Sequence, residues 1–289
     1  MKVATSLWLS WLLWALSLTA LPASAAAPPR VVALSWEMVE HLLQLGITPL
    51  AVADSADYRR WVVRPTLPAD VPDAGSRTEP NLELLAELKP DLILITPLLA
   101  DIRPQLERIA PVQVYGDFTQ DQDNRLLQRR NFLDLASQLQ RTPLAERKLQ
   151  AMDAHITELR QQLAIRFAGR PPKVSVVRFA SPTVVYVMGP NSMPDHALQL
   201  LGLQPAYRAP LSRWGDVQVP VSELGRIDQG ALLYIEPFAG QQRLFATRLW
   251  QSLPVVRHGQ VAGIAPTWTH GGIFCVEYLA EAIARGLLR

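Results

Sequence analysis

The residues best suited to bind a ligand are one arginine and a set of aromatic side chains in short polar segments. Arg77 lies in the segment Ser-Arg-Thr-Glu-Pro-Asn, just before a predicted helix start. The positive end of a helix dipole does not stabilise an arginine. Arg77 therefore either pairs with Glu79 or another carboxylate, or it binds a ligand. The aromatic side chains, with one histidine, are Trp36, Tyr58, Trp61, Trp214, Trp268 and His270.

The four tryptophans of this set fall in loops at the ends of predicted strands. In an α/β protein with two lobes, these strand ends border the crevice between the lobes. Core packing accounts equally well for any single tryptophan. Four of them in such loops favour a ligand cleft with an aromatic lining.

Patterns typical of catalysis or metal binding are absent from the sequence. It has no nucleophile elbow, zinc signature, phosphate-binding glycine loop or dinucleotide fingerprint. The five histidines are scattered along the chain: His41, His155, His196, His258 and His270. We therefore expect no enzyme, no cofactor and no metal held by the protein. The single cysteine, Cys275, allows no internal disulfide and is interpreted as a small buried hydrophobic residue.

The first 25 residues of the 289 predict a secretory signal peptide. Met1 and Lys2 form a short basic start, an apolar stretch follows, and Ala23-Ser24-Ala25 is a small-residue cleavage site. No cysteine lies near this site, so a lipid anchor is not expected. Removing Lys2 from the 28 Lys and Arg leaves 27 against 26 Asp and Glu, which argues against a nucleic-acid partner.

The first half of the chain alternates short apolar strands with amphipathic helices. The predicted order is strand 31–34, helix 36–45, strand 47–53, helix 81–89, strand 91–95, helix 103–109 and strand 112–115. Such alternation with short connections predicts an α/β fold with mainly parallel strands.

The second half repeats this layout. Three pairs of segments match in the same order: 45–49 with 201–205, 81–95 with 221–235, and 106–112 with 249–255. We therefore predict two lobes of similar α/β build, with strand 183–187 and helix 192–201 in the second.

A polar segment, residues 124–169, separates the two halves. Its apolar residues from Leu149 to Leu163 step by three and four, which predicts one helix of about five turns or more, with Pro143 in the first turn. The predicted fold is thus two Rossmann-like α/β lobes, residues 26–123 and 170–289, joined by a single long α-helix within 124–169.

Several motifs together resemble a known family. They are R-T-E-P-N-L-E-L-L, the upstream D-Y-R-R-W and the downstream Y-V-M-G-P-N-S. With the segments around them they resemble the periplasmic binding proteins of iron–siderophore ABC importers, above all those for ferric hydroxamates of the ferrichrome type. The resemblance covers essentially the whole mature chain. It implies a monomeric periplasmic protein that delivers a ferric siderophore to an inner-membrane ABC permease, with little closure of its lobes.

The resemblance also implies which residues form the ligand site. Arg77 matches the arginine that contacts the hydroxamate oxygens, and the iron is held by the siderophore alone. Trp36, Trp61, Trp214 and Trp268 match aromatic wall positions, and Tyr58 lies beside Trp61. Two departures concern polar contacts: a family tyrosine aligns near Leu99, and another is replaced by His270, which can supply a donor instead. One acidic residue on each lobe docks the permease, here Glu83 and Glu223; both also suit the first turn of a helix.

Two alternatives remain at this point. In the first alternative, the ligand is another iron chelate or a tetrapyrrole-like molecule, such as a catecholate siderophore, haem or cobalamin. Catecholates carry more negative charge and call for further basic residues, for which Arg59, Arg60 and Arg213 are candidates. The other alternative is a periplasmic enzyme that modifies the siderophore, although the sequence shows no catalytic pair for it.

Overall fold

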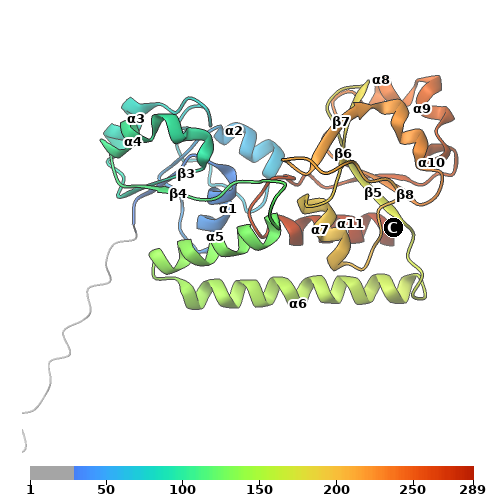
Figure 1. Cartoon of the computed structure of the whole chain (residues 1–289), viewed down its shortest axis with the longest axis horizontal. Helices are drawn as coiled ribbons and strands as arrows, with labels where there is room; N and C mark the ends of the chain where they lie inside the picture. The colour runs from blue at the N-terminus through green and yellow to red at the C-terminus, as the bar shows by residue number, and fades with distance from the viewer. Residues whose placement is uncertain (1–28) are drawn as a thin grey trace, which may run out of the picture.

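The molecule has two lobes that lie side by side above one long helix (Figure 1). The computed structural model describes residues 29–289, so the predicted signal peptide, residues 1–25, lies outside the described residues. The long helix is α6 (Thr142–Arg166), which extends from beneath one lobe to beneath the other. No helix within residues 29–289 combines the length and the apolar character needed to cross a membrane.

The N-lobe contains a parallel sheet with the strand order β2-β1-β3-β4. Its strands are β1 (Val31–Ala33), β2 (Ala51–Val52), β3 (Leu92–Ile95) and β4 (Val112–Val114). Its helical segments are α1 (Trp36–Gln44), α2 (Ser55–Asp57), the π-helical turn Tyr58–Val62, α3 (Leu82–Leu88), the 3₁₀ segment Pro97–Ile102 and α4 (Arg103–Glu107). β1 to β3 are buried throughout, as the uninterrupted apolar runs predict for strands covered on both faces.

The C-lobe contains a mixed sheet with the order β7-β6-β5-β8-β9. Its strands are β5 (Val174–Phe179), β6 (Val184–Met188), β7 (Asp216–Pro220), β8 (Ala231–Ile235) and β9 (Val261–Ile264). β5, β8 and β9 are parallel, whereas β6 runs antiparallel to both β5 and β7. Its helical segments are α7 (Met193–Leu200), the 3₁₀ segment Val221–Arg226, α8 (Gln241–Phe245), α9 (Arg248–Ser252), α10 (Pro254–Arg257) and α11 (Cys275–Leu288).

The two sheets share a strand order once β7 is set aside. β2-β1-β3-β4 in one lobe corresponds to β6-β5-β8-β9 in the other. The matched helix ends also agree, because Gly46 after α1 and Gly202 after α7 both have φ near the left-handed value, +72° and +74°. The predicted fold class, two α/β lobes with one long connecting helix, is confirmed.

Residues 124–169 contain the predicted long helix, α6, with Pro143 in its first turn, and a further helix, α5 (Asn124–Gln138), before it. The chain turns between the two at Gln140, whose φ is +55°. The bounds of one predicted strand are wrong. The predicted strand 47–53 is reduced to Ala51–Val52. The N–H of Ile47 instead donates to the carbonyl of Leu42 at the end of α1 (2.9 Å), and Pro49 has no N–H to give.

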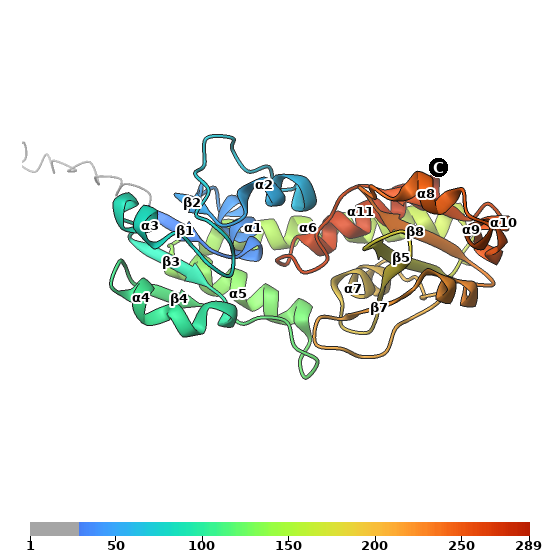
Figure 2. The ribbon, with the colours of Figure 1, turned by 90° about the horizontal axis from the view of Figure 1, so that it is seen from above.

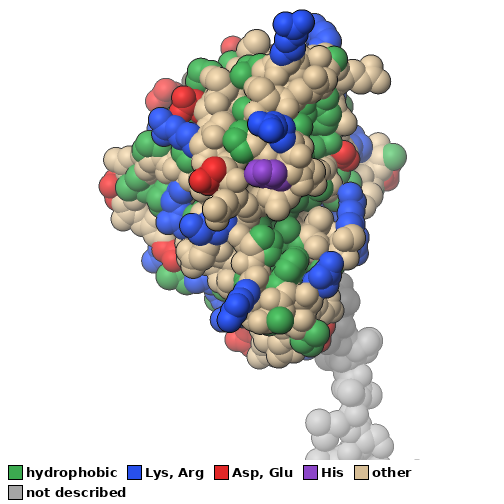
Figure 3. All heavy atoms as spheres, turned by 90° about the vertical axis from the view of Figure 1, so that its right-hand side faces the viewer, with side chains coloured by type: hydrophobic (Ala, Val, Ile, Leu, Met, Phe, Trp, Pro, Cys, Tyr) green, Lys and Arg blue, Asp and Glu red, His purple; other side chains and the backbone are tan. Residues whose placement is uncertain are grey.

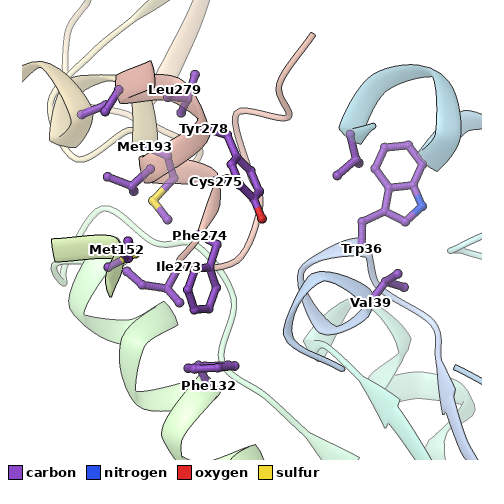
Figure 4. Close-up of a cluster of buried hydrophobic side chains, with 14 of the residues drawn as sticks. Trp36, Val39, Phe132, Met152, Met193, Ile273, Phe274, Cys275, Tyr278 and Leu279 are labelled. Carbon is purple, nitrogen blue, oxygen red and sulfur yellow. The ribbon is translucent and has the colours of Figure 1, made fainter. Parts of the chain in front are cut away.

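A continuous apolar core joins the lobes. It contains side chains of α1 and α5 beside the N-lobe together with α6, α7 and α11 (Figure 4). Phe132 of α5 meets Phe274 edge to face, with ring centroids 5.0 Å apart. Cys275 is buried in this cluster, as predicted, and burial raises the pKa of its thiol.

Polar contacts reinforce this joint where the chain before α11 reaches back to the N-lobe (Figure 2). Glu40 of α1 accepts the N–H of Phe274 at 2.7 Å, and the neutral His41 accepts the N–H of Ile273 at 3.2 Å. Gly272 permits this approach, since an added Cβ would lie 2.5 Å from Nε2 of His41. The two lobes are therefore fixed to each other by direct contacts as well as by α6.

The charges on the surface of the C-lobe end are mixed. Figure 3 shows basic side chains scattered among polar and acidic ones on this face, and not gathered into one patch. This face therefore has no basic patch of the kind that would bind a nucleic-acid backbone.

The joint makes a prediction about stability and pH. Burial raises the pKa of Glu40 to about 8, from 4.5 in an exposed chain. The folded protein therefore holds a proton that the unfolded chain releases, and the free energy of unfolding falls as the pH rises through this interval. Glu40→Gln, neutral at every pH, should be more stable than the wild type at pH 8 and approach it below pH 5, as measured by urea unfolding.

The exposed Glu87→Gln is the matched control, since Glu87 lies on the outer face of α3. Its difference from the wild type should stay constant across the same pH range. A constant difference for Glu40→Gln as well would contradict the assignment of a raised pKa to Glu40.

Candidate functional site

A cavity of about 520 Å³ opens between the two lobes. On the N-lobe side its wall is built at the carboxyl ends of the parallel strands. Ser35 lies just after β1, Thr96 follows β3, and Asp117 and Phe118 lie shortly after β4. Ligand sites of α/β sheets occur at this edge, so the fold itself places the cavity where the sequence predicted a crevice.

The C-lobe wall comes from a sheet face and two loops. Arg178, Tyr186 and Gln218 project from β5, β6 and β7. Trp214 lies just before β7, and the segment after β9 contributes Trp268 and His270. Thus the N-lobe wall mixes polar, charged and apolar side chains, while most of the large planar side chains lie on the C-lobe wall.

Arg77 lines the cavity and also pairs with a carboxylate. Its Nε donates to Oδ2 of Asp54 at 2.9 Å, and its backbone N–H donates to the same oxygen at 3.1 Å. Its guanidinium carbon lies 3.6 Å above the ring of Trp36. The partner is thus Asp54 rather than Glu79. Because no hydrogen bond within residues 29–289 engages its two terminal amino groups, they can reach a ligand.

Three of the predicted aromatic residues lie behind the cavity and do not line it. Trp36 is only 2% exposed, and its indole N–H donates to the carbonyl of Ala53 at 3.0 Å. Tyr58 is buried against Trp36 and donates its hydroxyl to the carbonyl of Pro65. Trp61 is half-buried against the main core. Trp36 therefore supports Arg77 from below.

The other three, Trp214, Trp268 and His270, do line the cavity. The His270 ring meets both tryptophans edge to face, with centroid distances of 5.8 Å to Trp214 and 5.6 Å to Trp268. Trp268 continues this contact to Trp36 at 4.9 Å. Edge-to-face packing is favourable for aromatic rings, so it holds a rigid, mostly apolar surface against which a ligand's carbon skeleton can pack.

Three acidic side chains, Glu37, Asp117 and Asp216, also line the cavity. Burial raises the pKa of Glu37 to about 7, although its own backbone and the nearby Arg77 oppose this rise. Burial also raises the pKa of Asp117. Asp216 places Oδ2 at 3.3 Å from Nε2 of His270. Burial therefore lowers the negative charge that Glu37 carries near neutral pH, which reduces its repulsion of a ligand with electron-rich oxygens.

The loop after β3 has leucines where the resembled family carries a pocket tyrosine. Leu99 is 3% exposed and packs in the N-lobe core, whereas Leu98 is 58% exposed and lines the cavity. Neither supplies a hydroxyl. A phenol is instead present on the opposite wall, at Tyr186. None of the arginines considered for a catecholate, Arg59, Arg60 and Arg213, lines the cavity.

Sequence reasoning missed Arg178, Tyr186 and Gln218. The one usable signal was a charged residue inside the apolar run Val-Ser-Val-Val-Arg-Phe of β5. Within the described residues no three His, Cys, Asp or Glu side chains are grouped closely enough to hold a metal ion. The arrangement fits an organic ligand with apolar surfaces and polar oxygens.

The two acidic residues considered for docking differ in their surroundings. Glu83 is exposed in the first turn of α3, whose N-terminus is capped by Asn81. Glu223 forms an ion pair with Arg226 at 3.0 Å. An exposed ion pair of this kind contributes little to stability.

The fold and cavity are those of a periplasmic binding protein, and the chain belongs to that family, whose model matches residues 31–267. It is 33% identical to the iron(3+)-hydroxamate-binding protein FhuD of Escherichia coli, over 98% of this chain and 94% of that protein. It is 29% identical to the achromobactin-binding periplasmic protein of Dickeya dadantii, over 92% and 88% of the two chains.

A solved structure agrees closely with this fold. The siderophore-binding protein FhuD of Vibrio cholerae, crystallised with Fe³⁺-Desferal bound, superposes with a TM-score of 0.88 at 39% identity. The match covers 91% of this chain and 98% of that one.

The buried position of Trp36 makes a prediction about stability. Trp36→Phe removes the indole donor to Ala53 and leaves a small void beneath Arg77. We expect the free energy of unfolding to fall by about 2 kcal/mol. Urea unfolding followed by circular dichroism measures this, and the half-buried Trp61→Phe, with a loss below about 1 kcal/mol, is the control. Equal losses in the two variants would contradict a supporting role specific to Trp36.

Proposed function

We propose that this chain captures ferric hydroxamate siderophores in the periplasm and delivers them to an inner-membrane ABC permease. The observation that carries the proposal is the state of Arg77. Its Nε and its ring contact fix it in place, while its terminal amino groups face an aromatic-walled cavity. The named ligands of the relatives in E. coli and V. cholerae support the same class of substrate.

The chemistry of a ferric hydroxamate fits this cavity. Six oxygens surround the iron and carry partial negative charge on the surface of the complex, where a guanidinium fork can donate two hydrogen bonds. The carbon skeleton is apolar and packs against Trp214 and Trp268. Because the siderophore saturates the iron, the protein needs no metal ligand of its own.

Binding without turnover and docking through acidic residues are parts of the same proposal. The relatives are named as binding proteins, so a bound chelate should be recovered unchanged. Glu83 and Glu223 are our candidates for permease contacts, one on each lobe. Of the two, Glu83 is the better placed, since it is exposed and Glu223 is already paired with Arg226.

The role of Arg77 is tested by its removal. Arg77→Ala should weaken binding of ferrichrome at least tenfold, because the complex loses a charged hydrogen-bond donor. The melting temperature should change little, since Arg77 and Asp54 are about one-third exposed. Quenching of tryptophan fluorescence gives the affinity. Arg103→Ala removes an arginine paired with Glu107 outside the cavity and is the control.

Two results would count against the proposal. If the wild type shows no quenching by micromolar ferrichrome, ferrioxamine or ferric coprogen, the hydroxamate class is excluded. If Arg77→Ala loses stability but keeps its affinity, Arg77 has a structural role only.

The titration of Glu37 near neutral pH leads us to predict that ligand binding depends on pH. Burial places its pKa at about 7, so it gains a negative charge as the pH rises through neutrality. That charge repels the oxygens of the chelate, and the affinity for ferrichrome should therefore decrease from pH 6 to pH 8. Glu37→Gln should bind with an affinity that varies much less over this range. A wild-type profile that rises with pH would exclude this role for Glu37.

A further inference from the structure

Arg178, Tyr186 and Gln218 form a straight row across three strands. Arg178 of β5 is directly opposite Tyr186 of β6, and Tyr186 is directly opposite Gln218 of β7. Side chains that are opposite one another in a sheet project from the same face. Here that face is the cavity wall, since all three residues line the cavity.

Contacts within the row orient its polar atoms. The guanidinium carbon of Arg178 lies 4.2 Å from the centre of the Tyr186 ring. The side-chain amide of Gln218 donates to the hydroxyl oxygen of Tyr186 at 2.6 Å. Because that oxygen already accepts a hydrogen bond, the hydroxyl proton of Tyr186 remains available to an acceptor in the cavity.

Arg178 itself lacks an acceptor. No carboxylate of the described chain lies within ion-pair distance of it, and its Nε is buried without a hydrogen-bond partner. Arg77 differs, since Asp54 occupies its Nε. An unsatisfied buried donor costs free energy until an acceptor arrives. The C-lobe wall thus holds a guanidinium to which a ligand oxygen can bind.

The two arginines face the same ligand space from different lobes. The guanidinium carbons of Arg77 and Arg178 both lie 5.8 Å from the ring centre of Trp268, so they cannot be further apart than twice this distance. None of the acidic cavity residues forms an ion pair with Arg178: Asp216 faces His270 at 3.3 Å, and burial raises the pKa of Glu37 to about 7 and also raises the pKa of Asp117.

We infer that Arg178, Tyr186 and Gln218 form a second recognition element for ligand oxygens, which makes this site selective for ferric hydroxamates of net negative charge. Chelates that include a citrate carboxylate are the substrate class it fits, over neutral or cationic hydroxamates. The inference rests on the proposed function and adds a specificity-determining residue to it. In this arrangement, Arg77 donates hydrogen bonds to the chelate from the N-lobe and Arg178 donates them from the C-lobe.

The test compares three ferric hydroxamates that differ in charge. Ferrioxamine B is cationic, ferrichrome is neutral, and the ferric complex of schizokinen, a citrate-based dihydroxamate, is anionic. Affinities come from tryptophan-fluorescence titration at low ionic strength, where charge differences are least screened. The wild type should bind the anionic complex most tightly.

Substitutions assign the preference to Arg178. Arg178→Gln should weaken binding of the anionic complex at least tenfold and that of ferrichrome less than threefold. Arg178→Lys keeps the charge and should keep most of the preference. Arg166→Gln also removes an arginine that contacts an aromatic ring, outside the cavity at the end of α6, and should change neither affinity. Tyr186→Phe, which deletes only the hydroxyl, gives a second measurement if Arg178→Gln folds poorly.

The outcomes separate the two proposals. If the wild type binds none of the three complexes, the proposed function fails and the inference with it. If the wild type binds them but the ratio between anionic and neutral complexes is the same in Arg178→Gln, the inference alone is overturned. A preference of the wild type for the cationic complex would also overturn it.

Discussion

The contact between α1 and the start of α11 sets the position of one lobe against the other. Two backbone N–H groups of the C-lobe bind Glu40 and His41 of the N-lobe, inside an apolar core that both lobes share. The cavity has one wall from each lobe, so its width and the meeting of Arg77 with Trp268 follow from this joint. Gly272 suits this position because an added Cβ would come within 3 Å of the side chains of Glu40 and His41.

The two walls of the cavity contribute different kinds of side chain. The N-lobe positions Arg77 by means of Trp36 and Asp54, both of which lie behind or beside it. The C-lobe provides the aromatic surface and a polar row that crosses three strands. This division follows from topology. Parallel strands of the N-lobe present their ends to the cavity, whereas the antiparallel strands of the C-lobe present a face.

Much of the fold could be predicted because it depends on local patterns. Helix starts, left-handed glycines and short buried strands each leave a signature in the sequence, and the loop position of Arg77 singled out a residue that lines the cavity. The sequence could not predict whether Trp36 lines the cavity or lies in the core, since a residue in the first turn of α1 can face either one. Arg178 was missed because its place in the cavity wall depends on which face of β5 is turned toward the N-lobe, and the local sequence does not show this.

The buried joint between α1 and the start of α11 has a consequence for ligand binding and release. A binding protein whose lobes are preformed loses little conformational freedom on binding, so its affinity reflects the contacts themselves. Any separation of the lobes must break the buried contacts of Glu40 and His41 with the start of α11, so opening of the cavity in this way has to supply their free energy.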